Sequence, residues 1–264
     1  MKKKHVAKMA IISGLLFISA YAQASLYVLP KGVYASTPYT LGPTTPGKWG
    51  DPVPGTPATV SWSLMGDGIT CSWDCTGTVS SLAGFMPAGF ETEIQRAFDA
   101  WENVAGITFV RVTDSGDDFD AAGAQGDIRI GGHSFDGSSG TLAHGFYPPA
   151  NGVSAAGDIH FDTGETWDIG GSSGIDIFSV ALHEIGHAIG LGHSTDPDAV
   201  MFPYYLSPYT GLDEDDINGA VALYGAPAPV PLPAAAWLML SGLGILVGFA
   251  RRKKGEAAPL AFTA

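Results

Sequence analysis

Twelve residues, HEIGHAIGLGHS at positions 183–194, constrain the fold of this chain more than any other stretch. Residues four apart on a helix lie on the same side, so a helix here would present His183 and His187 to one point. Gly190 permits the chain to turn back sharply, and His193 then reaches the same point. Three imidazole nitrogens leave a fourth position open on a zinc ion, which is typical of a catalytic site. The alternative is that the histidines are incidental on a helix that only packs.

The residues around this motif predict the helix that carries it. Glu184 lies one residue along from the first histidine, near enough to reach a water on the ion without being a ligand. Apolar side chains recur at helical spacing through DIFSVALHEIGHAIG, and we expect them to form one buried stripe. The stripe consists of Ile177, Val180, Ala181, Ile185 and Ala188.

Both ends of the chain carry an apolar run. Three lysines at positions 2–4 precede an apolar run that leads to Ala22-Gln23-Ala24, a small-x-small cleavage pattern, and this order is typical of a secretory signal peptide. A second run, residues 234–250, is followed by the basic cluster of residues 251–254. It is at the short limit for a membrane-spanning helix, and the basic residues would mark its cytoplasmic side. A plain membrane anchor is one interpretation of this tail.

The charge between the two ends argues against one class of partner. Of the 26 acidic residues only Glu256 lies beyond residue 233, whereas five of the 13 basic residues lie within residues 25–233, so this part carries a net charge of about −20. We therefore expect no binding to nucleic acid. High acidity favours solubility, and oxygen-rich loops also hold calcium.

The region between the ends is long enough for one domain with a real core, and it contains further helix and strand patterns. Residues 25–46 show no periodicity and are expected to be a leader or short pro-segment. Leu212 precedes the acidic first turn of a last helix that ends at Gly225. Strands are predicted in ATVSWSLM, GITFVRV, GDIRIGG, GTLAHGFYPP and GDIHFD, and helices from Glu91 to about Val104 and within LDEDDINGAVALYG.

Cys71 and Cys75 are the only cysteines, and they are four residues apart in CSWDC. A local disulfide is expected in an exported protein. Zinc binding by this pair alone would lack two ligands.

The segment VALHEIGHAIGLGHSTDPDAVMFPYY closely resembles the active-site segment of the matrixins, the matrix-metalloproteinase-like branch of the metzincin peptidases. Ser194 after the third histidine, Met201 as the Met-turn, and Pro203 with Tyr205 fall at the family's spacing. The resemblance extends from GKWGDP near residue 47 to Gly225. It implies an α+β fold of the metzincin, zincin-like kind, with a twisted mixed five-stranded sheet and three helices.

The resemblance also implies a role for each motif residue. His183, His187 and His193 would bind the catalytic zinc. Glu184 would be the general base on the zinc-activated water, so that the protein is a zinc metalloendopeptidase acting on protein or peptide substrates. The remaining implied roles are an apolar floor beneath the metal from Met201 and walls of the specificity pocket from Pro203 and Tyr205.

Two further segments, IGGHSFDGSSGTLAHGF and GDIHFDTGE, resemble the matrixin segments that hold a structural zinc and a calcium. The zinc ligands implied by this match are His133, His144 and His160. The family usually has an Asp two residues after the first of these histidines, and Phe135 stands there instead. Asp136 or a water could be the fourth ligand instead, or the site could be empty. The alternative is that these are three surface histidines that bind no metal.

Calcium is implied by the same match. The carboxylates of Asp136, Asp162 and Glu165, with backbone carbonyls of the GSSG loop, would form one calcium site. Asp127 and Asp158 correspond to a second calcium site, although a polar residue is expected at a strand start in any case. The propeptide cysteine that blocks zinc in the family has no counterpart, because Cys71 and Cys75 lie after the first strand.

The carboxyl-terminal tail resembles PEP-CTERM sorting signals of the VPLPA type from Gram-negative bacteria. This resemblance implies export, handling by an exosortase-type sorting enzyme, and delivery to the bacterial cell envelope, surface or extracellular matrix. The expected organisation is a signal peptide (1–24), a leader (25–46), a matrixin-like catalytic domain (47–225), a proline-rich linker (226–233), a transmembrane sorting helix with its basic cluster (234–254) and a tail (255–264).

A second hypothesis comes from another class of protein. The chain would then be a weakly active or inactive surface or matrix protein that uses a metalloprotease fold for binding. Glu184 together with all three histidines favours the enzyme. We find no carboxylate pair at the placement that glycosidases use, so action on polysaccharide has no support.

Overall fold

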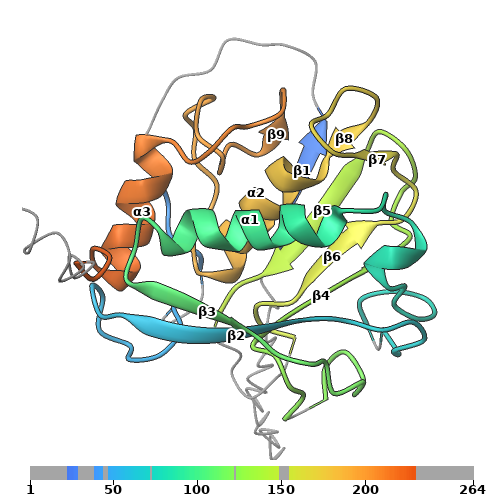
Figure 1. Cartoon of the computed structure of the whole chain (residues 1–264), viewed down its shortest axis with the longest axis horizontal. Helices are drawn as coiled ribbons and strands as arrows, with labels where there is room; N and C mark the ends of the chain where they lie inside the picture. The colour runs from blue at the N-terminus through green and yellow to red at the C-terminus, as the bar shows by residue number, and fades with distance from the viewer. Residues whose placement is uncertain are drawn as a thin grey trace, which may run out of the picture. The chain divides into compact units, whose positions relative to one another are not determined.

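The computed structural model describes residues 23–28, 39–43, 47–71, 73–121, 123–148 and 155–229 (Figure 1). The chain divides into two units, residues 1–227 and 228–264, and all described elements lie in the first. The helices are η1 (Leu82–Gly84), α1 (Phe90–Glu102), α2 (Ile177–Ala188) and α3 (Glu214–Tyr224). The strands are β1 (Gln23–Val28), β2 (Ala58–Leu64), β3 (Ile107–Arg111), β4 (Ile128–His133), β5 (Thr141–Phe146), β6 (Ile159–Asp162), β7 (Trp167–Asp168), β8 (Ile175–Asp176) and β9 (Tyr204–Tyr205).

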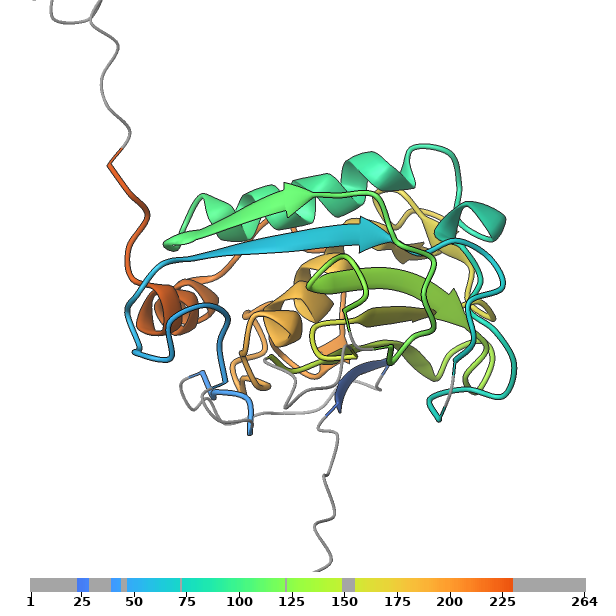
Figure 2. The ribbon, with the colours of Figure 1, turned by 90° about the horizontal axis from the view of Figure 1, so that it is seen from below.

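The main sheet is mixed, with the strand order β3-β2-β4-β6-β5-β1-β9. Strands β3, β2, β4 and β6 are parallel to one another, whereas β5 is antiparallel to both β6 and β1. Strand β1 in turn pairs in parallel with β9. Figure 1 shows the twist of the sheet from β2 through β4 to β5, and Figure 2 shows α1 lying along β2 and β3.

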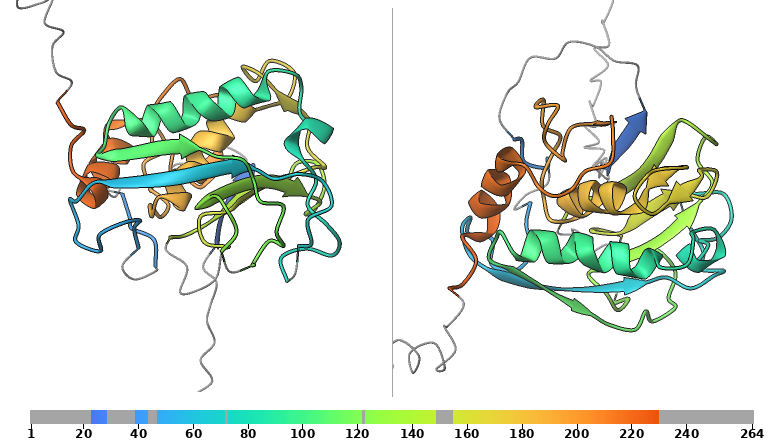
Figure 3. Two further views of the ribbon diagram at one scale, coloured as in Figure 1. Left: turned by 60° about the horizontal axis from the view of Figure 1, so that its bottom comes forward. Right: turned by 45° about the horizontal axis from the view of Figure 1, so that its top comes forward.

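Helices α1 and α2 pack against each other and against the sheet (Figure 3). The indole N–H of Trp101 on α1 donates to the carbonyl of Leu182 on α2 at 2.9 Å, inside the core. Stacked aromatic rings join α1 to the sheet, with the ring centres of Trp62 and Phe98 4.5 Å apart. Removal of these large rings from water is the main force that holds α1 on the sheet.

The predicted fold class is confirmed: the described residues form an α+β fold with three α-helices, and β2 to β6 form the mixed five-stranded part of the sheet. Two features extend this prediction. Strands β1 and β9 lengthen the sheet beyond β5, and β1 lies in residues that were expected to be the end of a signal peptide and an irregular leader.

Among the described residues, no helix is long and apolar enough to cross a bilayer. The apolar run of residues 234–250 and most of the predicted signal peptide lie outside the described residues. The predicted domain boundaries therefore stay predictions.

Candidate active site

Helix α2 is held in the core along its whole length. Its N-cap is Asp176, whose Oδ2 accepts hydrogen bonds from the backbone N–H of Ser179 at 3.0 Å and from its hydroxyl at 2.6 Å. All residues from Ile177 to Ala188 are buried. Because a helix that is buried all round has a fixed rotation, the polar side chains of the motif point in defined directions.

The rings of His183 and His187 are oriented by backbone carbonyls. Each ring donates its Nδ1–H at 2.7 Å, His183 to the carbonyl of Val200 and His187 to that of Leu191. The two Nε2 atoms then face each other at 3.0 Å. Burial lowers the pKa of His183 to about 3 and that of His187 well below its usual value, so both rings are neutral and both Nε2 atoms carry lone pairs. Two facing lone pairs repel unless a cation lies between them, which fits a shared metal ion.

A sharp turn after α2 brings the third histidine to the same place. Gly190 has a φ of 111°, a conformation that favours glycine, and a Cβ there would collide with the carbonyl oxygen of Gly47. The ligand nitrogens of His183, His187 and His193 lie within 4.8 Å of one another. Three imidazoles at this spacing suit zinc.

Glu184 is fully buried between α2 and β5. A Cβ at Gly145 on β5 would lie 3.2 Å from the Oε2 atom of Glu184 and 2.9 Å from its carbonyl oxygen. The strand therefore approaches the carboxylate closely because Gly145 has no side chain. The ring of Tyr147, just past β5, meets the ring of His187 edge-on, with centres 5.4 Å apart.

Met201 packs against α2, and its expected role as an apolar floor beneath the metal stays a prediction. It is 1% exposed, and a Cβ at Gly186 would collide with its sulfur. Its carbonyl accepts the N–H of Ser194 at 2.8 Å, which ties this turn to the residue after His193. The carboxylate of Asp216 accepts the N–H groups of Val200 and Met201. Asp216 was expected to be a charge at a helix N-terminus, and it also holds the turn.

The residues predicted to wall a specificity pocket are partly buried on or beside β9. The hydroxyl of Tyr205 accepts the N–H of Asp176 at 3.2 Å, which joins β9 to the start of α2. A cavity of about 430 Å³ lies in the loop that follows, and neither Pro203 nor Tyr205 lines it. Its lining is Pro197, Asp198 and residues 206–213.

An extended segment of the chain's own amino-terminal region lies beside the active-site helix. Strand β1 contacts α2 and pairs antiparallel with β5, with Ala24 opposite Gly145 and Leu26 opposite Ala143. On its other side, Tyr27 and Val28 pair in parallel with β9. The space between β5 and β9 therefore holds an extended polypeptide.

The structure gathers the other three predicted zinc ligands into a second group. His133, His144 and His160 come from β4, β5 and β6, and the carboxylate beside them is that of Asp74. Burial lowers the pKa of His160 to about 4. Asp136, considered as a substitute ligand, lies elsewhere, because its carboxylate accepts the N–H of Thr141. Sequence reasoning missed Asp74, although an acidic residue within an expected disulfide loop is a signal that could have found it.

The predicted calcium ligands mostly contact backbone groups. Glu165 Oε1 accepts the N–H of Ser139, and Asp162 Oδ1 accepts those of Phe135 and Gly164. Asp162 Oδ2 is buried without a hydrogen-bond partner among the described residues. These carboxylates, with Asp136, surround the loop of residues 137–140, but they do not form a close side-chain group within the described part of the chain.

Asp127 and Asp158 serve other strands. Asp127 Oδ2 accepts the N–H and hydroxyl of Ser61 on β2, and Asp158 Oδ1 accepts the N–H of Arg129 on β4. Asp158 is fully buried, and burial raises its pKa well above the usual value. Both residues fit the interpretation that strand starts need a polar group here.

The sequence pattern of the family described as Matrixin matches residues 73–225. The chain belongs to the matrixin family. Karilysin from Tannerella forsythia is 40% identical over 153 residues, which cover 55% of this chain and 30% of that relative. The hatching enzyme of Paracentrotus lividus is 44% identical over 144 residues, covering 51% of this chain and 22% of that relative. The interstitial collagenase of Equus caballus is 39% identical over 160 residues, covering 58% and 33%.

The matrixin region includes both histidine groups and all of the elements from η1 to α3. The chain spans a third or less of the length of these curated relatives. The activity of the whole protein therefore has to be argued from its own site.

Proposed function

We propose that this matrixin is a zinc-dependent metalloendopeptidase, with zinc held by His183, His187 and His193 and with Glu184 as general base. The observation that carries the proposal is the pair of Nε2 atoms of His183 and His187, 3.0 Å apart while both Nδ1–H groups donate to carbonyls. A hydrogen bond between the rings is excluded for neutral histidines in this tautomer, because neither Nε2 has a proton.

When bound, zinc would act as a Lewis acid on the scissile carbonyl and would activate water. The chain's own residues supply the remaining steps. Glu184 takes a proton from the attacking water and passes it to the nitrogen of the leaving amine, which breaks the peptide bond. Met201 and Asp216 fix the turn that supports the histidines.

An extended peptide is the substrate class that the site supports. Strand β1 shows that a backbone fits between β5 and β9, in hydrogen-bonding register with both. A peptide bound in this way gains affinity from its main chain, and side-chain pockets then select the sequence. Pro203 and Tyr205 are proposed to wall such a pocket.

We infer that the protein works outside the cell. The predicted signal peptide and the VPLPA-type tail support export and sorting to the cell envelope or matrix by an exosortase-type enzyme. Calcium bound by Asp136, Asp162 and Glu165 is a further proposal, supported by the buried and unsatisfied Oδ2 atom of Asp162.

Cleavage of unfolded casein by residues 25–229 tests the proposal. We expect cleavage that a zinc chelator abolishes and that added zinc, but not magnesium, restores. A zinc-loaded protein that cleaves neither casein nor a random peptide library would contradict it. That result would favour the alternative of a surface or matrix protein that uses the fold for binding.

A further inference from the structure

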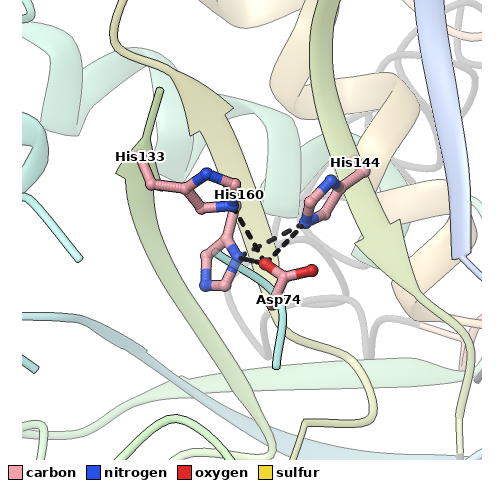
Figure 4. A group of neighbouring side chains, drawn as sticks. All are labelled: Asp74, His133, His144 and His160. Carbon is pink, nitrogen blue, oxygen red and sulfur yellow. Dashed lines mark hydrogen bonds and ion pairs between the residues drawn. The ribbon is translucent and has the colours of Figure 1, made fainter. Parts of the chain in front are cut away.

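Asp74 occupies the centre of the second cluster, which consists of Asp74, His133, His144 and His160 (Figure 4). Its Oδ2 atom lies 2.9 Å from Nε2 of His133, 3.2 Å from Nε2 of His144 and 2.7 Å from Nδ1 of His160. The last two ring nitrogens are 3.3 Å apart. All four side chains are buried or nearly so, with exposed fractions of 0% to 7%.

Hydrogen bonds alone explain these distances poorly. Nδ1 of His133 donates to the carbonyl of Ser134 at 3.1 Å, and its Nε2 is one of three ring nitrogens within 3.2 Å of Oδ2 of Asp74, although a single carboxylate oxygen has only two lone pairs. Tetrahedral zinc with bonds of about 2.0–2.1 Å would hold its ligand atoms roughly 3.3 Å apart. The four ligand atoms of the second cluster approach this spacing from four different segments of the chain.

The residue that stands at the family's usual carboxylate position cannot bind metal. The ring of Phe135 stacks on His144, with centres 4.7 Å apart and planes 3° from parallel, and it lies 4.3 Å from the ring of His133. It shields two of the histidines from solvent. The cluster therefore needs its carboxylate from elsewhere, and Asp74 provides it.

A disulfide fixes the backbone that carries Asp74. Cys71 and Cys75 are joined, and the N–H of Asp74 donates to the carbonyl of Cys71 at 3.0 Å inside the closed loop. Cys71 is fully buried in a small apolar cluster that includes Phe119 and Phe146. Because the loop has no regular secondary structure, an open loop would sample many positions of the carboxylate, and closure removes that freedom.

We propose that Asp74 is the fourth ligand of a zinc site completed by His133, His144 and His160, and that the Cys71–Cys75 disulfide holds this ligand in place. Metal affinity at the second cluster then depends on a covalent bond in a separate loop. The proposal does not depend on peptidase activity, because metal content alone reports it.

Zinc titration of residues 25–229 against a competing chelator tests the proposal. We expect the unmodified protein to bind two equivalents of zinc and Asp74→Asn to bind one. The affinity of the second cluster for zinc should fall at least tenfold in this variant. The retained equivalent at the active site shows that the variant is folded. Asp117→Asn, which removes an exposed carboxylate outside the cluster, should bind two equivalents of zinc. The assignment of Asp74 would be overturned if the unmodified protein bound only one equivalent of zinc. It would also be overturned if Asp74→Asn bound two equivalents with unchanged affinity.

The double variant Cys71→Ser/Cys75→Ser tests the role of the disulfide. We expect the affinity of the second cluster for zinc to fall about tenfold while the affinity of the active site is unchanged. Unchanged zinc affinity at both sites would overturn the role of the disulfide. A further test leaves Asp74, Cys71 and Cys75 unchanged and uses the variant His187→Ala, which lacks one of the three active-site histidines. By linkage, zinc should slow the reduction of the Cys71–Cys75 bond to two thiols by a phosphine, and equal rates with and without zinc would contradict the coupling.

Discussion

The carboxylate of Asp216, at the start of α3, accepts the backbone N–H of Met201 at 3.0 Å beneath the active-site helix. The same carboxylate accepts the N–H groups of Val200 and Asp213. One buried side chain thus joins the capping box of α3 to the turn whose carbonyl, at Val200, orients the ring of His183. This link connects α3 to the histidines proposed to bind zinc.

The Asp216 link predicts a dependence of stability on pH. Burial raises the pKa of Asp216 to about 6, above its value of 3.8 in the unfolded chain, although the three N–H donors favour the charged form. Between about pH 4 and pH 6 the folded state then binds more protons than the unfolded state, so stability from this group falls as the pH rises. The contribution of Asp216 to the free energy of unfolding falls by roughly 3 kcal/mol over this pH range, and the fall is complete above about pH 6.

Urea unfolding of the unmodified protein and of Asp216→Asn, at equal free zinc from pH 4 to pH 7.5, measures this effect. The advantage of the unmodified protein over the variant should shrink as the pH rises to about 6 and then stay constant. A difference that is flat, or that grows with pH, would show that Asp216 has no raised pKa.

The contact between Gly186 and Met201 predicts a packing defect in Gly186→Ala. Alanine normally favours a helix over glycine by about 1 kcal/mol, but here the new Cβ would meet the sulfur of Met201 and lie 3.1 Å from the Trp101 ring. Overpacking should therefore destabilise the protein by about 1–3 kcal/mol and lower zinc affinity. Gly66→Ala is the matched control, because a Cβ there has nothing within 4 Å. A variant as stable as Gly66→Ala would refute tight packing under α2.

Metal removal should weaken the fold, because the lone pairs of His183 and His187 then face each other at 3.0 Å without a cation. Binding to the folded state alone stabilises by about 4 kcal/mol when free zinc is 1,000-fold above the dissociation constant. We expect the unfolding temperature to rise steadily with the concentration of free zinc and to stay unchanged when magnesium is added. An unfolding temperature that does not change with zinc would count against both histidine groups as metal sites.

Strand β1 predicts that the amino-terminal segment competes with substrate. Its backbone occupies the space between β5 and β9 that we propose for an extended peptide. A chain that begins at residue 30 should therefore show a lower KM for a peptide substrate than one that begins at residue 25, with kcat and zinc content unchanged. Equal KM values would place the substrate elsewhere.

Much of the fold follows from local patterns in the sequence. The alternation in ATVSWSLM and the helical spacing around Trp101 depend on neighbours a few residues apart, and β2 and α1 begin and end close to the predicted positions. The active-site histidines belong to one short motif, so one helix and one turn place all three. Such local features need no knowledge of topology.

Pairings between distant segments were not predictable in this way. Residues 25–46 have no periodicity, and strand β1 forms only because β5 and β9 offer hydrogen-bonding edges on both sides. Asp74 lies 59 residues before His133 and 86 before His160, so only the folded sheet brings them together. Asp216 looked like an ordinary charge at a helix start for the same reason.

Glu184→Gln tests most directly whether Glu184 is the general base of a zinc peptidase. The amide has nearly the same shape but cannot take a proton, so we measure zinc content and kcat/KM for casein peptides in both proteins. We expect unchanged zinc content and a fall in kcat/KM of about 100- to 10,000-fold. A variant that keeps its zinc and cleaves at the unmodified rate would contradict it.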